Sequence, residues 1–241
     1  MSGHNKWSKI KNKKGKNDRA RGAIFTKLCR VITLAAREGG GDPDMNFSLR
    51  MAMQKARVSN VPKDNIERAV KKGTGELNDG TIIEEVLYEG IGPNGVAVLV
   101  NSLTDNKKRT VSEVKFALSK HGGNVGSPGS VTWQFDRKGM IRFTTDKKTL
   151  ITDWEEFQLD LMDAGADDIK DEDGGVEILC PIEKFKDVTI IFEKTTIEPD
   201  DIGIAWIPKD VMPADEQLAE KIDLLIEALE ELDDVKEVFT N

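Results

Sequence analysis

The chain has 241 residues, of which 38% are hydrophobic and 32% are charged, and its formal net charge is −8. This length suits one to three domains, and no apolar run approaches 18 residues, which excludes a membrane-spanning helix. Cys29 and Cys180 lie far apart, which excludes a disulfide framework and a zinc site built on cysteine pairs. We therefore expect a cytoplasmic protein.

Charge is divided unevenly along the chain. Residues 1–75 contain 18 Lys and Arg against 6 Asp and Glu, whereas residues 76–241 contain 17 against 37. A basic N-terminal part presents its own positive field even though the whole chain is acidic. The division predicts that the N-terminal part binds a polyanion.

Residues 1–17 form a basic arm without periodicity. Such a density of cations repels itself and stays unfolded unless a polyanion neutralises it. Trp7 within the arm could stack on a base or enter a groove of a nucleic acid. The alternative is that Trp7 and Ile10 fold back onto the following helices and the lysines only solubilise the chain. The candidate nucleic-acid-binding residues in and just after the arm are Lys6, Trp7, Lys9, Lys11, Lys13, Lys14, Lys16, Arg19 and Arg21.

The pattern of residues 18–78 predicts a small helical domain. A first helix begins near Asp18, carries apolar residues at helical spacing and ends at Gly39. A second is expected over 44–58, and a third after Asn60, ending at Gly73. The last two could form a helix-turn-helix with Lys63, Asn65 and Arg68 at base edges, or an ordinary bundle.

Residues 79–137 together with 209–241 predict an α+β domain. Period-two patterns give strands at 82–90, 95–103 and 130–136, with a helix at 107–121. The C-terminal residues add a helix at 214–232 and a strand at 235–240. The sequence GIGPNG at 90–95 matches a dinucleotide fingerprint, but a second strand follows it, so we interpret it as a hairpin turn.

Residues 138–208 predict an inserted, ferredoxin-like α+β domain. Its order is βαββαβ, with a helix at 150–164, strands at 140–145, 167–172, 176–180 and 202–207, and a helical segment after Pro181. The whole chain is therefore expected to be a multi-domain α+β protein, in which this third domain is inserted into the second.

The segment 104–110 places Lys107, Lys108 and Arg109 at the start of a helix. Three cations beside helix N-terminal amides could hold a phosphate. The alternative is a capped, solvated helix start with Thr104 or Asp105 as the cap.

No constellation indicates catalysis, a metal or a cofactor. The acidic residues at 167–173 do not fit the register of a calcium loop, so a charged turn is the better interpretation. His4 and His121 lack the partners that a nucleophile, a base or a zinc site requires. We therefore expect neither an enzyme nor a small-molecule substrate.

Several motifs together resemble the YebC/PmpR family over essentially the whole chain. They are residues 3–11 (GHNKWSKIK), 25–28 (FTKL), 39–43 (GGGDP), 60–66 (NVPKDNI), 103–106 (LTDN), 109–111 (RTV), 121–124 (HGGN) and 232–235 (LDDV). Asn5 stands where Ser is expected and Glu38 where an apolar residue is expected. Neither departure touches a cationic position.

The resemblance implies a three-domain cytoplasmic protein with a helical N-terminal domain, two α+β domains and no enzymatic activity. Members are generally described as probable transcriptional regulators that bind DNA. Mitochondrial relatives are translational activators for a cytochrome oxidase subunit, and bacterial members have been linked to the ribosome and to relief of stalling at proline-rich stretches.

We therefore expect a nucleic-acid-binding regulator of gene expression, with DNA and transcription as the first interpretation. The alternative is a translation factor that binds ribosomal RNA and ribosomal proteins. A hydrolase or nuclease with a basic substrate face is a third hypothesis.

Overall fold

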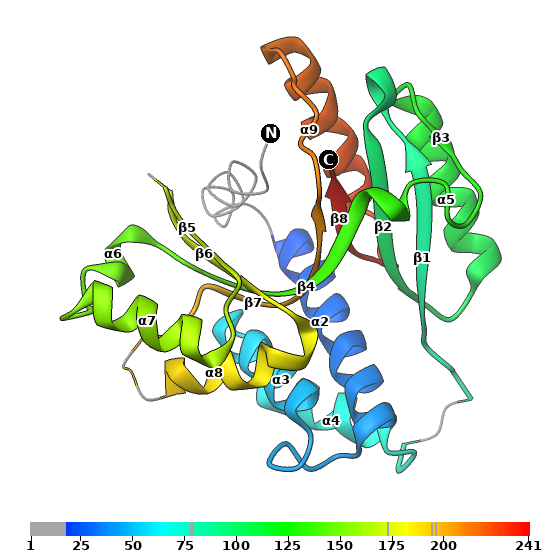
Figure 1. Cartoon of the computed structure of the whole chain (residues 1–241). Helices are drawn as coiled ribbons and strands as arrows, with labels where there is room; N and C mark the ends of the chain where they lie inside the picture. The colour runs from blue at the N-terminus through cyan, green and yellow to red at the C-terminus, as the bar shows by residue number, and fades with distance from the viewer. Residues whose placement is uncertain (1–17, 78–79, 173, 194, 196) are drawn as a thin grey trace. The chain divides into compact units, whose positions relative to one another are not determined.

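The computed structural model describes residues 18–77, 80–172, 174–193, 195 and 197–241. Their backbone divides into two compact units (Figure 1). The first contains the described residues up to Phe135 and the segment Pro208–Asn241, and the second contains Asp136–Ile207. The predicted α+β class is confirmed, since helices are followed by two antiparallel sheets with further helices. The predicted division into a separate helical domain and an inserted domain stays a prediction.

Three helices open the first unit: α2 (Asp18–Gly39), α3 (Phe47–Val58) and α4 (Lys63–Gly73). Their shared core consists of small and branched side chains, among them Ile32, Leu49 and Ala56, each fully buried. Asn46 fixes the corner between α2 and α3. Its Oδ1 accepts the Leu49 amide at 3.0 Å and its Nδ2 donates to the Ala35 carbonyl at 2.8 Å, which satisfies groups left open at the ends of both helices.

The first sheet has the strand order β3-β1-β2-β8. Its strands are β1 (Glu84–Ile91), β2 (Ala97–Thr104), β3 (Asn124–Val125) and β8 (Val235–Thr240), and its helices are α5 (Lys107–Lys120) and α9 (Glu216–Glu230). Alternate residues of β2, such as Val98 and Val100, pack with α5 and α9 in one core. Strands β1 and β2 pair antiparallel through the turn Pro93–Gly95, in which Asn94 and Gly95 have positive φ. This confirms the hairpin interpretation of residues 90–95.

The strand expected at 130–136 is wrong. The segment instead contains a 3-10 turn, Thr132–Gln134, and a strand begins only at Phe135. The cause is Glu89, a buried side chain on β1. Its carboxylate accepts the amides of Gly129, Val131 and Thr132 at 2.6, 2.8 and 2.9 Å. Because these donors already have an acceptor, they are not available to a neighbouring strand. The short strand β3 closes that edge of the sheet instead.

The second unit has the order β4, α7, β5, β6, α8, β7, as predicted from the sequence. The bounds are β4 (Phe135–Phe143), α6 (Thr145–Lys148), α7 (Trp154–Ala164), β5 (Asp168–Glu172), β6 (Gly175–Cys180), the 3-10 turn Ile182–Lys184, α8 (Phe185–Glu193) and β7 (Asp201–Pro208). The sheet order is β5-β6-β4-β7, which is the split arrangement expected of a ferredoxin-like unit. Phe143, Phe157 and Phe192 pack edge to face in its core.

Replacing Glu89 with Gln should lower the free energy of unfolding by about 1–3 kcal/mol, because a Gln amide group cannot accept all three loop amides and a buried unpaired donor costs this much. Burial alone would raise the pKa of Glu89, but hydrogen bonds from Thr132, Val131 and Gly129 lower it below its ordinary value of 4.5. The carboxylate therefore stabilises the fold above pH 4.5, and this contribution is lost as the pH falls through the lowered pKa.

Urea unfolding at several pH values measures both effects. The gap in stability between wild type and E89Q should narrow as the pH falls below 4.5. The control is E220Q, which makes the same charge change at an exposed position on α9. Equal stability of E89Q and E220Q at pH 7 would refute the role given to Glu89.

Candidate nucleic-acid interface

The sequence-predicted site residues fall into two groups. Lys6, Trp7, Lys9, Lys11, Lys13, Lys14 and Lys16 lie outside the described residues. Arg19 and Arg21 lie on the first turn of α2. Lys107, Lys108 and Arg109 lie on the first turn of α5. The geometry of the candidate site can therefore be built from α5 and the contacts that hold it.

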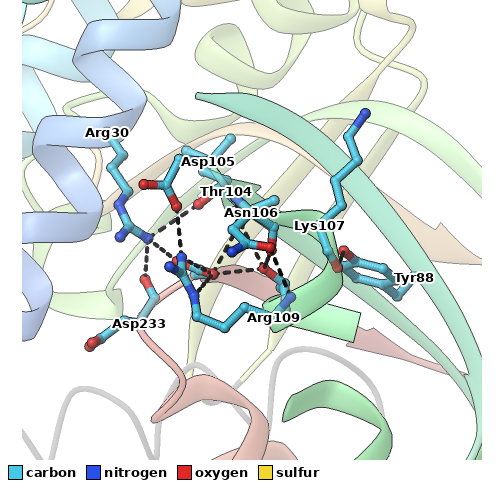
Figure 2. A network of polar contacts seen from close by, with 11 residues as sticks. Arg30, Tyr88, Thr104, Asp105, Asn106, Lys107, Arg109 and Asp233 are labelled. Carbon is cyan, nitrogen blue, oxygen red and sulfur yellow. Dashed lines mark hydrogen bonds and ion pairs between the residues drawn. The ribbon is translucent and has the colours of Figure 1, made fainter. Parts of the chain in front are cut away.

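A buried carboxylate, Asp234, positions the start of α5. The Arg30 Nη1 of α2 lies 2.6 Å from its Oδ1, and the Arg109 Nη2 of α5 lies 2.7 Å from its Oδ2. The hydroxyls of Thr104 and Thr110 lie 3.1 and 2.7 Å from the same Oδ2. The two guanidinium groups come from different elements, α2 and α5, and Figure 2 shows both arginine side chains within one network of polar contacts. The side chain of Asp234 is only 1% exposed, so every charge on it must be balanced by the protein.

The protonation of this cluster follows from its contacts. Burial alone would raise the pKa of Asp234, but hydrogen bonds from Thr110, Arg109 and Arg30 lower it below its ordinary value. The hydrogen bonds that Arg109 donates to Asp234 and to Asp105 raise the pKa of Arg109. The carboxylate is therefore ionised and Arg109 is charged at neutral pH.

Arg109 differs from the sequence-based expectation. Its guanidinium contacts Asp234 and also Asp105, at 2.8 Å. Two carboxylates balance its charge, so its observed contacts are structural. The phosphate-binding role given to it stays a prediction.

Cations of α2 also contact the end of α9. Arg30 Nη1 donates to the carbonyls of Leu103 and Asp233 at 3.2 and 2.8 Å, and the Lys27 ammonium donates to the Glu230 carbonyl. A positive charge at a helix C-terminus is favourable because the last carbonyls are unpaired and carry the negative end of the dipole. Lys27 and Arg30 thus fasten α2 to the loop that carries Asp234.

The start of α5 is capped by Asn106. The Arg109 amide donates to the Asn106 Oδ1 at 3.1 Å, and the Asn106 amide donates to the Thr104 hydroxyl at 2.9 Å. The expectation that Thr104 or Asp105 is the cap is therefore wrong, because Asn106 is the residue whose side chain accepts an amide of the first turn. Lys107 pairs with Glu84, which leaves Lys108 as the first cation directed outward: no described residue makes a hydrogen bond or ion pair with its ammonium.

The outer face of α5 is uniformly basic. Lys108, Ser112, Lys115 and Ser119 follow the spacing of one helical stripe opposite the buried Val114 and Leu118, and all four are exposed. Lys108 and Lys115 are about 10 Å apart along the helix axis. Phe116, 70% exposed, borders the stripe, and the exposed Lys120 lies beyond it, on the side of the helix that also carries Glu113. Within α5, which the structure describes in full, the one carboxylate, Glu113, is half-buried at the edge of this face.

Sequence reasoning missed Lys115, Phe116 and Lys120. The signal was present, since positions 108, 112, 115 and 119 lie on the side of the helix opposite Val114 and Leu118. The sequence-based prediction included only the cations of the first turn, Lys107, Lys108 and Arg109.

Helix α4 offers a contrast. Its exposed charged positions mix both signs: Asp64 and Glu67 lie among Lys63, Arg68 and Lys71, and Lys63 pairs with Glu67 at 3.5 Å. The two carboxylates would repel a phosphate. The proposed recognition helix is therefore a less suitable polyanion surface than α5.

The described part of the chain contains no group of three or more His, Cys, Asp or Glu side chains placed to hold a metal ion. Among the helices described there, none combines the length and the apolar character needed to cross a bilayer.

Replacing Asp234 with Asn should lower the free energy of unfolding by about 2–4 kcal/mol, because it leaves Arg30 and Arg109 without their buried counter-charge. The estimate is at the low end for a buried pair since both arginines are partly exposed. Urea unfolding measures the change. D233N is the matched control, because Asp233 is exposed and binds Arg30 only through its backbone carbonyl. A D234N protein as stable as D233N would contradict the role of the cluster.

Comparison with known proteins identifies the family. The family model described as the TACO1/YebC protein N-terminal domain matches residues 5–76, and the one described as the TACO1/YebC second and third domain matches residues 83–241. A probable transcriptional regulatory protein of Geobacter sulfurreducens is 48% identical over 100% of this chain and 95% of its own, and one of Maridesulfovibrio salexigens is 47% identical with the same coverage.

A solved structure shares the fold. The crystal structure of a conserved hypothetical protein from Aquifex aeolicus is 41% identical, with a TM-score of 0.83 over 94% of this chain and 91% of that one. Together with the two family models, this full-length likeness shows that the chain belongs to the TACO1/YebC family, the one its sequence motifs resemble.

Proposed function

We propose that this protein is a non-enzymatic, nucleic-acid-binding regulator of transcription that contacts the phosphates of DNA through its basic arm and the outer face of α5. The observation that carries the proposal is the pair of outward lysines on one stripe of α5, Lys108 and Lys115, which share that stripe with serines and with no carboxylate. Lysines without protein partners release counterions when they meet phosphates, and this release drives binding.

The surroundings of α5 make this pair significant. Residues 76–241 contain 37 Asp and Glu against 17 Lys and Arg, so a random helix face there would carry carboxylates. A face of one sign in an acidic segment indicates a specific need for positive charge, because surfaces that only solubilise mix both signs. The names of the relatives, probable transcriptional regulatory proteins, support the same partner class.

A second candidate is a translation factor that binds ribosomal RNA. It is favoured by the mixed charges on α4, where a recognition helix would need a surface that approaches phosphates and base edges. Phosphate contacts without base reading suit irregular, structured RNA. In this reading the acidic remainder of the chain would contact basic ribosomal proteins.

The absence of catalysis is part of the proposal. It is supported by the roles of two buried carboxylates whose pKa is lowered: Asp234 and Glu89 are both occupied by hydrogen bonds that hold the fold. Carboxylates used in this way are not poised for proton transfer.

Fractionation of a cell lysate on a sucrose gradient at low salt separates the two candidates. Protein that stays free of ribosomes and binds one promoter fragment at least tenfold more tightly than random duplex would support transcription. Steady co-migration with ribosomes would support translation and contradict the first candidate.

Replacing Lys108 and Lys115 with Ala should reduce the slope of log K against log salt by about 1.8 for duplex DNA, since each phosphate contact contributes about 0.9. The matched control is K184A/K186A, which removes two exposed lysines from the second unit. The comparison variant K9A/K11A/K13A/K14A should abolish polyanion binding while urea stability stays unchanged. An unchanged slope for K108A/K115A would exclude α5 from the interface, and unchanged affinity of the arm variant at low salt would exclude the arm.

A further inference from the structure

We propose that Trp133 is a stacking platform for an unpaired nucleobase, so that the preferred ligand is a nucleic acid with single-stranded or looped-out bases. This inference rests on the proposed nucleic-acid binding and adds to it the structural class of the ligand. Trp133 lies in the loop 126–134, which follows β3 and contains none of the α5 residues.

The loop that carries Trp133 is rigid. The Glu89 carboxylate accepts the amides of Gly129, Val131 and Thr132, and the Glu89 carbonyl accepts the Gly126 amide at 2.8 Å. Glu89 of β1 thereby holds the loop at its start, Gly126, and near its end, Val131 and Thr132. A ring placed on such a support loses little conformational freedom when it binds a ligand.

The indole of Trp133 is fixed and exposed. Its Nε1–H donates to the Ser130 carbonyl at 3.0 Å, and 68% of the residue is exposed. Because the one polar group of the ring is already satisfied, the surface offered to a partner consists of the apolar ring faces. No aromatic ring or cation of the described residues stacks on them, whereas Trp154 packs against Phe143 and Phe157 and Trp206 lies under Arg137.

The surroundings of the ring suit a nucleotide better than an apolar protein surface. The exposed residues that precede it in the loop, Ser127, Pro128, Gly129 and Ser130, are all small, so this part of the loop adds no large apolar side chain to the ring. The exposed Lys209 ammonium donates to the Trp133 backbone carbonyl at 2.9 Å, which places a positive charge at the loop that carries the ring. The charge of Glu89 is buried under three amide donors, so it repels a phosphate weakly.

The ring requires an unpaired base. In a duplex both faces of each base are covered by its neighbours, and aromatic side chains stack only on bases that are free of the helix. An adjacent phosphate would then lie within reach of Lys209 and of the serine hydroxyls. Stacking is tolerant of sequence because every base has a π face, so this site would add preference for single strands without reading a sequence.

The test uses two labelled probes with the same number of phosphates: a 12-mer of oligothymidylate and a 12-mer of abasic sites. Fluorescence anisotropy gives the affinity of the full-length protein for each. Wild type should bind the base-containing probe about 5- to 100-fold more tightly than the abasic probe. W133A and W133L should lose this preference while their affinity for the abasic probe stays unchanged, and W133F should retain most of it.

The controls separate stacking from other effects. L150A removes an apolar side chain of similar exposure, 64%, from the second unit and should keep the wild-type preference. Urea midpoints equal to that of wild type show that the variants are folded. If W133A keeps the preference, or if wild type binds both probes equally, the inference about Trp133 is wrong while the proposed phosphate binding stands. If wild type binds neither probe, the proposed function falls and the inference falls with it.

Discussion

One buried carboxylate determines how the first unit is assembled. Asp234 receives Arg30 from α2 and Arg109 from α5, at 2.6 and 2.7 Å, and it lies between α9 and β8. An unpaired charge at this buried position would cost several kcal/mol. Separating α2 or α5 from the α9–β8 loop would leave Asp234 without a counter-charge, so the pairs hold these elements together. Because α2 directly follows the basic arm and α5 carries the outward lysines, the same ion cluster sets the relation between the α5 face and the helix from which the arm extends.

The positive charge on α5 stands out against the composition of the chain. Most cations beyond residue 75 are matched by carboxylates, as Lys107 is by Glu84, Lys138 by Asp167 and Lys147 by Asp200. Exposed pairs of this kind contribute little to stability but cancel the field of each lysine. Lys108 and Lys115 have no such match, and the acidic remainder would repel a polyanion from other surfaces. Under the proposed function, this distribution would direct a phosphate chain toward the arm and one helix face.

Much of the fold could be predicted from the sequence, since helical stripes and strand alternation place every long element within a few residues. Two of the failures, at residues 130–136 and at Arg109, share one physical cause, which is that long-range polar contacts override local pattern. The alternating residues 130–136 do not form a strand because the Glu89 carboxylate, about forty positions away, takes their amides. Arg109 was expected to face solvent, but its partner Asp234 is 125 positions away, and no local pattern joins the two. The lysines of the α5 stripe, in contrast, required only helical periodicity.

The most direct test of the central claim is lysine acetylation footprinting of the intact protein, read by mass spectrometry with and without nucleic acid at low salt. The account predicts that Lys108, Lys115 and Lys120 become protected together with the lysines of residues 1–17, and that added salt removes the protection. Lys184 and Lys186 of the second unit should react equally in both states. Unchanged reactivity of Lys108 and Lys115 in a saturated complex, or protection confined to the second unit, would contradict the account.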